Sequence, residues 1–273
     1  MSDPRLEADY DVMSGVAASM PDIVAEWVAA SRTAVAVAPS RHTVAYGNAP
    51  GLAYDVFFPT GRLRGALIFL HGGFWVQGNK DAVAFPAPCF TKAGIAYISV
   101  TYGLAPAHSL DAIIANVEAA AASIAAEALG WGLALDRIAV VGHSAGAYLA
   151  AALTASPRRP FDPLATQLIS GLFDLTAIAE LGKIKALALS ADDCRRLSIS
   201  GAALAGANNV VLAVGSTEPA GFQAQTRSFY AAAKAAGSSV SLLTTPGDDH
   251  FSIARALGDP NGMLTRRSLA FFD

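Results

Sequence analysis

The chain has 273 residues, of which 53% are hydrophobic and 15% are charged, so it can bury a core large enough to cover both faces of a sheet. Its formal net charge of -3 at pH 7 favours neither nucleic acid nor an anionic membrane as a partner. The first residues lack the basic and apolar regions of a signal peptide, and the two cysteines lack metal or redox spacing. We therefore expect a cytoplasmic protein with reduced thiols.

The N-terminal part of the chain predicts helices and then an edge hairpin. Residues 1–35 are helical in pieces, and a helix opens at Pro21 with apolar residues at helical spacing. We expect this helix to pack over the core, with a place in the wall of the substrate entrance as the alternative. Two strands follow at about 43–46 and 52–58, and alternation in the second indicates an antiparallel hairpin at a sheet edge.

From residue 65 onward, apolar strands alternate with helices. We predict strands at 65–70, 95–100, 138–141, 167–170, 210–214 and 239–244, and helices at 83–93, 110–129, after residue 145, at 220–236, at 251–257 and at the end of the chain. The apolar stretch 112–135 contains polar residues and predicts an amphipathic helix, not a membrane span. The fold class is therefore α/β, with a mainly parallel eight-stranded sheet and helices on both faces. We predict a single domain over residues 1–273, with 174–207 as an irregular connection that forms a short cap-like insertion.

One pentapeptide organises the predicted sheet. The strand at 138–141 runs into Gly142-His143-Ser144-Ala145-Gly146, and an alanine-rich helix follows. Strand, G-x-S-x-G and helix are the context of a nucleophile elbow, in which the two glycines relieve collisions in a tight turn. We therefore predict that Ser144 is a nucleophile, exposed at the carboxyl end of its strand.

A serine hydroxyl needs a base to take its proton at neutral pH. His250 follows the last predicted strand and comes after Ser144, which is the chain order of elbow enzymes, so we predict that it is the base. Three of the other histidines precede the elbow: His42, His71 and His108. His143 lies within the elbow and is expected to point away from the reacting hydroxyl.

The acid that orients this base is expected on the loop after the penultimate strand. Glu218 is the only carboxylate in the loop 215–219, so we predict that it orients His250 and stabilises its imidazolium. Asp174 follows the preceding strand and is an alternative. Other carboxylates also compete on sequence alone: Asp192, Asp193, Asp248 and Asp249.

Acyl transfer also requires N–H donors for the oxyanion. Gly72 and Gly73 follow the third strand without side chains in the way, and Ala145 begins the helix after the nucleophile. We predict that these three N–H groups form the oxyanion hole. Phe74 and Trp75 then lie at the mouth of the site, where an apolar pocket is expected, and a place in the core is equally open for Trp75.

Several segments extend this pattern over nearly the whole chain. The motif at 71–75 has the form H-G-G-x-W, and the segments that accompany it are Tyr10, residues 27–31, Lys80, Tyr102 with residues 104–106, the G-H-S-A-G elbow, residues 170–175, residues 215–218 with Phe222 and Gln225, and His250 with Phe251. In these motifs the chain resembles the α/β-hydrolases of the hormone-sensitive-lipase/esterase group, and within that group the kynurenine formamidase (arylformamidase) branch.

The resemblance implies the α/β-hydrolase fold and a triad of Ser144, Glu218 and His250, with the oxyanion donors named above. Among the residues around this site, we expect four to contact the substrate: Phe74, Trp75, His143 and Tyr102. The sequence departs from the family where the usual Y-R-L-A-P-E reads Y-G-L-A-P-A at 102–107, and the cap run at 183–187 has no clear counterpart.

The expected activity is that of a cofactor-free serine hydrolase cleaving a small, aryl-bearing formamide or ester. Short-chain carboxylester hydrolysis is the close alternative, and a non-catalytic ligand-binding relative and an interfacial lipase are more distant ones. No two histidines have i, i+4 spacing and no phosphate-loop glycines follow a strand, so no metal or nucleotide is expected. The expected partner is the small-molecule substrate, and the family resemblance adds pairing as a homodimer.

Overall fold

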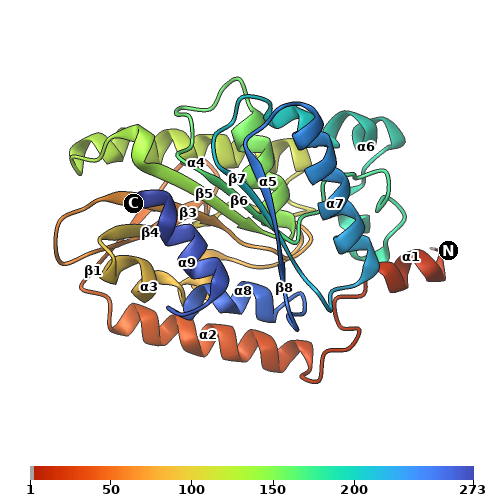
Figure 1. Cartoon of the computed structure of the whole chain (residues 1–273), viewed down its shortest axis with the longest axis horizontal. Coiled ribbons are helices and arrows are strands. Elements are labelled where there is room, and N and C mark those ends of the chain that lie inside the picture. The colour runs from red at the N-terminus through yellow and green to blue at the C-terminus, as the bar shows by residue number, and fades with distance from the viewer. Residues whose placement is uncertain (1–2) are drawn as a thin grey trace.

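The sheet at the centre of the molecule has eight strands in the order β1-β2-β4-β3-β5-β6-β7-β8. A computed structural model describes residues 3–273 (Figure 1). The strands are β1 (Ser40–Ala45), β2 (Ala53–Phe58), β3 (Gly65–Leu70), β4 (Ile95–Thr101), β5 (Ile138–His143), β6 (Thr166–Ile169), β7 (Val210–Gly215) and β8 (Val240–Thr245). β2 is antiparallel to both β1 and β4, whereas all pairings from β4 to β8 are parallel. The predicted mainly parallel sheet with an antiparallel edge hairpin is confirmed.

Helices cover both faces of the sheet because its central strands are apolar on both sides. One face carries α4 (Leu110–Gly130), α5 (Ala145–Ala155) and α7 (Ala220–Ala235), and the other carries α3 (Ala87–Lys92), α8 (Ser252–Arg255) and α9 (Met263–Leu269) (Figure 1). Successive residues of a strand point to opposite faces, so in β3 Ile68 packs with the first group of helices and Phe69 with the second.

The longest helix, α4, packs against the sheet on one side only. By length and composition alone it is apolar enough to cross a membrane, but in the fold Ile113, Val117 and Ile124 are buried in the core. Glu127 lies exposed on its other side. The predicted amphipathic helix is confirmed, and it begins at Ser109, whose side chain accepts a hydrogen bond from the N–H of Ala112.

Two helices precede the sheet, α1 (Pro4–Asp9) and α2 (Met20–Ala36). α2 begins at Met20, one residue before the predicted start at Pro21. Ser19 caps it, and its side chain accepts from the N–H of Asp22. In Figure 1, α2 runs along the lower side of the molecule beneath α8, whereas α1 lies beside the lower end of α7. The N-terminal segment thus spans the edge of the sheet where the parallel strands end.

The connections differ from the sequence prediction in three places. The helix expected at 83–93 is divided into η1 (Lys80–Val83) and α3, because Pro86 and Pro88 interrupt helical hydrogen bonding. The segment 174–207, expected to be irregular, contains η3 (Gly182–Leu187), α6 (Ala191–Leu197) and η4 (Gly201–Leu204). The helix expected at 251–257 is α8 followed by η5 (Ala256–Gly258). The two remaining short turns are η2 (Leu135–Arg137) and η6 (Ala270–Phe272).

Candidate active site

Ser144 occupies a sharp turn between β5 and α5. Its backbone has φ 55° and ψ -122°, a conformation that L-residues rarely adopt. A Cβ atom on Gly142 would lie 2.1 Å from the carbonyl oxygen of Gly146, and one on Gly146 would lie 2.0 Å from that of Leu70. Only glycine fits at both positions, so the turn holds the Ser144 side chain at the carboxyl end of β5.

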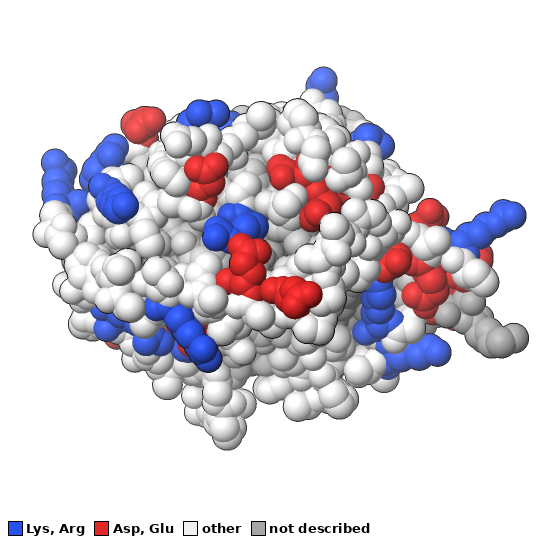
Figure 2. Space-filling view, turned by 90° about the horizontal axis from the view of Figure 1, so that it is seen from below, with Lys and Arg blue, Asp and Glu red and all other residues white. Residues whose placement is uncertain are grey.

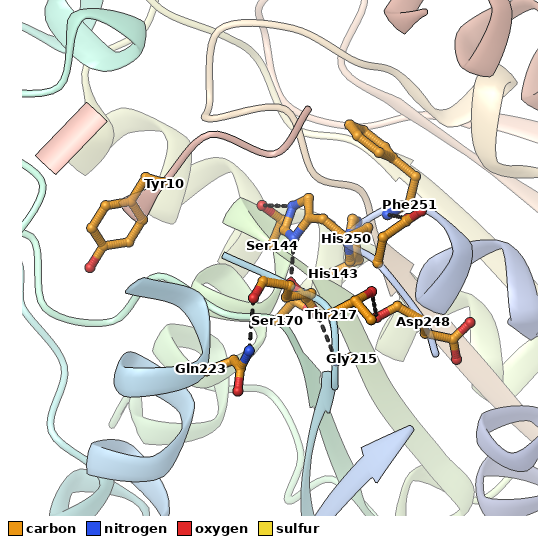
Figure 3. A network of polar contacts seen from close by, with 12 residues as sticks. Tyr10, His143, Ser144, Ser170, Gly215, Thr217, Gln223, Asp248, His250 and Phe251 are labelled. Carbon is orange, nitrogen blue, oxygen red and sulfur yellow. Dashed lines mark hydrogen bonds and ion pairs between the residues drawn. The ribbon is translucent and has the colours of Figure 1, made fainter. Parts of the chain in front are cut away.

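The structure brings Ser144, His250 and Glu218 into one hydrogen-bonded series. Figure 3 labels the first two of these residues. Nε2 of His250 lies 3.1 Å from Oγ of Ser144, and Nδ1 lies 2.7 Å from Oε2 of Glu218. The three residues follow β5, β8 and β7, whose carboxyl ends meet at one edge of the sheet. All three side chains are buried, so the charge of the carboxylate is little screened by solvent.

The second carboxylate oxygen of Glu218 has partners of its own. Oε1 accepts hydrogen bonds from the hydroxyl of Ser170 at 2.6 Å and from the N–H of Gly215 at 2.7 Å. Ser170 follows β6 with φ 54° and is fully buried. Sequence reasoning did not assign Ser170 to the site, although it lies in the segment 170–175 that matches the family.

The loops that carry Glu218 and His250 are tied to each other. The backbone N–H and the hydroxyl of Thr217 both donate to the carbonyl oxygen of Asp248, at 3.1 and 2.8 Å (Figure 3). The N–H of Gly247 donates to Oγ of Ser216 at 2.8 Å. These bonds join the two loops two residues before the base, so acid and base are positioned together.

The competing carboxylates lie away from His250 Nδ1 and have other roles. Oδ1 of Asp174 accepts from the N–H groups of Thr176 and Ala177 and stabilises a turn. The side chains of the remaining four are engaged by groups near them in sequence: Asp192 by Arg195, Asp193 by Ser190 and Arg196, and both Asp248 and Asp249 by Ser252. In this structure Glu218 is the carboxylate that contacts His250.

His143, inside the elbow, contacts both the backbone and the ring of His250. Its Nε2 lies 2.9 Å from the backbone oxygen of His250, and the two rings are 4.7 Å apart. Burial, followed by the nearby His250, holds the pKa of His143 well below its ordinary value of 6.5. The ring is therefore neutral, with Nε2–H donating to the carbonyl, and it also lines the cavity above Ser144.

The loop after β3 places its two glycines against the nucleophile. A Cβ atom on Gly72 would lie 3.1 Å from Cβ of Ser144, and one on Gly73 would lie 2.1 Å from the carbonyl oxygen of Gln77. Gly73 has φ 118°, so the chain doubles back here, and its oxygen accepts from the N–H of Gln77. Within residues 3–273, the N–H groups of Gly72, Gly73 and Ala145 have no hydrogen-bond acceptor.

Buried contacts hold this loop at both ends. At its start, the hydroxyl of Tyr102 donates to the carbonyl oxygen of His71 at 2.7 Å, and the two rings stack 4.3 Å apart. Burial lowers the pKa of His71 to about 4. At its end, Nζ of Lys80 lies 3.0 Å from Oδ2 of Asp55, a carboxylate on β2 that also binds Arg41 at 2.7 Å.

Two of the four expected substrate contacts require correction. Phe74 and His143 line the cavity, but Trp75 and Tyr102 are fully buried and do not. The backbone turns through positive φ at both Phe74 and Trp75, which directs the indole beneath the loop. There it packs edge-on against Tyr148, with ring centres 5.3 Å apart. Trp75 and Tyr102 support the loop from the core.

A cavity of about 850 Å³ opens above Ser144 and His250. Apolar side chains from α2 form one wall, among them Ile23, Trp27 and Val28. This helix therefore lines the candidate site in addition to packing on the core, which the sequence pattern did not favour. Within residues 3–273, no group of three or more His, Cys, Asp or Glu side chains is placed to hold a metal ion.

The fold and the elbow agree with comparisons to known proteins. A family model described as the alpha/beta hydrolase fold matches residues 67–253, more than half of the chain. The chain therefore belongs to the α/β-hydrolase fold family, and it is an enzyme of the hydrolase class.

Its curated relatives include formamidases and esterases. Kynurenine formamidase of Danio rerio is 28% identical over 96% of this chain and 89% of its own length. Kynurenine formamidase of Salmo salar is 28% identical over 82% and 79%. Esterase LipC of Mycobacterium tuberculosis is 33% identical over 49% of this chain and 36% of its own length.

Solved structures share the architecture at lower identity. A proposed thioesterase from Silicibacter sp. tm1040 has a TM-score of 0.84 at 22% identity, covering 98% of both chains. An esterase of Pyrobaculum calidifontis has a TM-score of 0.69 at 18% identity, covering 100% of this chain and 98% of its own. At these identities the likeness shows the fold alone.

Proposed function

We propose that this hydrolase cleaves a small, aryl-bearing formamide or ester through a triad of Ser144, His250 and Glu218. The observation that carries the proposal is the hydrogen-bonded series from Oγ of Ser144 through both ring nitrogens of His250 to Glu218, at 3.1 and 2.7 Å. Ser144 and His250 line a mainly apolar cavity, and the three N–H groups of Gly72, Gly73 and Ala145 have no acceptor within residues 3–273. Nucleophile, base, orienting acid and oxyanion donors are thus together.

Acylation follows from this geometry. Nε2 of His250 takes the proton of Ser144 as Oγ attacks the carbonyl carbon of the substrate. The oxyanion that forms accepts hydrogen bonds from the N–H groups of Gly72, Gly73 and Ala145. Glu218 stabilises the imidazolium through Nδ1–H. The imidazolium then gives its proton to the leaving amine or alcohol, and an acyl group remains on Ser144.

Deacylation repeats these steps with water as the nucleophile. His250 takes a proton from the water as it attacks the acyl carbon, and returns the proton to Oγ of Ser144. The products are formate, or another carboxylate, and the free enzyme. No residue needs to move far between the two halves, because the same nitrogen serves both as base and as acid.

The formamide is favoured over the ester by the relatives that match most of this chain. The two fish proteins named kynurenine formamidase align over 96% and 82% of it, whereas LipC aligns over 49%. Aromatic side chains at the cavity, among them Trp27, Phe74 and Phe251, suit an aryl group. Short-chain carboxylester hydrolysis is the second candidate, because an ester carbonyl meets the same nucleophile and the same donors.

The test measures kcat/KM for N-formylkynurenine beside p-nitrophenyl acetate, butyrate and octanoate. We expect the formamide to be preferred, at roughly 10⁵ M⁻¹s⁻¹ or above, within the range of physiological substrates. Fast ester turnover with a negligible formamide rate would assign a carboxylesterase instead.

A fluorophosphonate probe tests the nucleophile without reference to the substrate. We expect one adduct, on Ser144, by peptide mass analysis, and neither adduct nor turnover in a folded Ser144→Ala variant. Wild-type turnover in that variant would overturn the proposed mechanism.

A further inference from the structure

Two opposite charges lie side by side on the otherwise mainly apolar wall of the cavity. Lys183 comes from η3, and Asp11 comes from the segment between α1 and α2. Nζ of Lys183 lies 3.6 Å from Oδ1 of Asp11. The two side chains are 35% and 48% exposed, so a ligand in the cavity is able to reach both.

The Lys183 ammonium is positioned beside the oxyanion loop. Its Nζ lies 5.6 Å from the centre of the Phe74 ring and donates a hydrogen bond of 3.2 Å to the carbonyl oxygen of Tyr10. Phe74 directly follows Gly73, and its ring packs on Phe222, which contacts the ring of His250 at 4.2 Å. A substrate group bound at Lys183 would therefore lie beside Phe74, whose ring packs on Phe222 and through it against His250.

Both charges are held in place and still have capacity to bind. Oδ1 of Asp11 accepts from the N–H of Met13 at 3.2 Å, whereas Oδ2 has no partner among residues 3–273. An ammonium group has three donors, and the bond to Tyr10 and the ion pair with Asp11 engage two of those on Lys183. An ion pair this exposed contributes at most about 1 kcal/mol to the free energy of folding, so it adds little to the stability of the protein.

The face of the molecule seen from below in Figure 2 has no large area of positive charge that would attract an anion. Figure 2 shows acidic and basic side chains intermixed there, over a largely uncharged surface, and both signs occur at the end where α1 lies. Selection of a charged substrate therefore depends on a local pair of charges and not on a field of one sign.

We propose that Lys183 and Asp11 form a subsite for an α-amino acid group on the substrate. The substrate carboxylate binds the Lys183 ammonium, and the substrate ammonium binds Asp11, so one internal ion pair is exchanged for two intermolecular ones. A lone carboxylate would meet the repulsion of Asp11, and a lone amine that of Lys183. The inference rests on the proposed function and names its substrate class: an aryl formamide or aryl ester that carries a zwitterionic group.

A second cation, Arg32, also lines the cavity. It lies exposed on α2, and within residues 3–273 it has no ion pair or hydrogen bond that would hold its guanidinium in one place. The other acidic side chain at the cavity, Asp81, is paired with Lys80 at 2.8 Å and Arg41 at 3.7 Å and not with Arg32. Arg32 therefore offers a carboxylate site without an acid paired to it. The pair at Lys183 is the one that matches both charges of a zwitterion.

The experiment compares matched substrates that differ only in the amino acid group. The formamide pair is N-formylkynurenine and 2′-formamidoacetophenone, and the ester pair is O-acetyltyrosine and 4-methylphenyl acetate. For each pair, the ratio of kcat/KM for the zwitterionic over the neutral member is measured in wild type, Lys183→Met, Asp11→Asn, Arg32→Met and Lys185→Met. Lys185 lies on the same η3, is exposed and does not line the cavity, so it is the control for loss of a charge.

We expect Lys183→Met and Asp11→Asn each to lower the ratio by roughly tenfold, mainly through KM, and Lys185→Met to leave it unchanged. In the Ser144→Ala background, Lys183→Met should weaken binding of the zwitterionic substrate by a similar factor in calorimetry. An unchanged ratio in Lys183→Met, or a ratio that falls in Arg32→Met instead, would overturn the subsite. Ser144 labelling and turnover of neutral substrates are measured separately in wild type, so either result leaves the proposed function standing. Absence of both from wild type would remove the proposed function itself.

Discussion

The hydroxyl of Ser170 donates a 2.6 Å hydrogen bond to Oε1 of Glu218, the carboxylate oxygen that His250 does not use. With the N–H of Gly215 on the same oxygen, the carboxylate is held so that Oε2 faces Nδ1 of His250. Ser170 achieves this from a fully buried position after β6 with φ 54°. The acid of the proposed triad is thus oriented by the neighbouring strand as well as by its own loop.

We expect Ser170→Gly to lower kcat by roughly tenfold with KM nearly unchanged. A hydrogen bond to a charged group contributes about 1.5–3 kcal/mol, and here it fixes the orientation of Glu218 relative to His250. Glycine is the informative substitution because it accepts the positive φ without strain, so the hydroxymethyl group is removed without straining the backbone. Steady-state kinetics and thermal unfolding check the result. An unchanged kcat would mean that the N–H of Gly215 alone positions the carboxylate.

Substitution of Glu218 and of Asp174 tests which of these two carboxylates is the acid that orients His250. We expect Glu218→Gln to lower kcat/KM by roughly 10³–10⁴-fold, the scale of removing the orienting charge from a serine triad. Asp174→Asn should change it by less than about threefold, since its carboxylate stabilises a turn and does not contact His250. Comparable losses in the two variants would contradict this assignment.

The elbow and the sheet were predictable because their determinants are local. Gly142 and Gly146 are required by atoms within the turn and by the adjacent β3, and such a requirement is visible as a pattern in sequence. The strands were found because central strands of a parallel sheet are continuous apolar runs. The position of Glu218 followed from chain order, since loops at one edge of a parallel sheet meet in space.

The cavity wall could not be predicted in the same way. Lys183 and Tyr10 are joined by a hydrogen bond across 173 positions, and no local pattern marks either as a partner of the other. The sequence left Trp75 open between the substrate pocket and the core, and a positive φ at both Phe74 and Trp75 turns the indole into the core. A backbone conformation that L-residues rarely adopt is set by the surrounding fold. The direction of a side chain at such a residue therefore cannot be predicted from its position in the sequence.

Gly146→Ala should destabilise the protein by about 3 kcal/mol or more, because the added Cβ would lie 2.0 Å from the carbonyl oxygen of Leu70. Backbone atoms of β3 cannot retreat without breaking the central sheet. Gly130→Ala is the matched control, since nothing lies within 4 Å of its Cβ position at the end of α4. Urea unfolding measures both. Equal midpoints for Gly146→Ala and wild type would contradict the close approach of α5 to β3.

Stability should fall as the pH is lowered from about 6.5 to about 4, with His71 as one cause. Burial lowers the pKa of His71 in the folded protein to about 4, against an ordinary value of 6.5. Between these values the unfolded chain binds a proton at this residue and the folded chain does not. The free energy of unfolding therefore decreases by about 1.4 kcal/mol for each pH unit, and this contribution is fully present only above about pH 6.5.

Replacing His71 by Asn removes this titration, so the comparison is between slopes and not between absolute stabilities. We expect the unfolding free energy of His71→Asn, measured in urea from pH 6.5 to 4.5, to depend less on pH than that of wild type by about 1.4 kcal/mol per unit. His42→Asn, at an exposed position on β1, is the control for the loss of an imidazole outside the core. Parallel curves for His71→Asn and wild type would mean that the folded protein protonates His71 as readily as the unfolded chain does. The ring would then be more open to water than its 2% exposure implies.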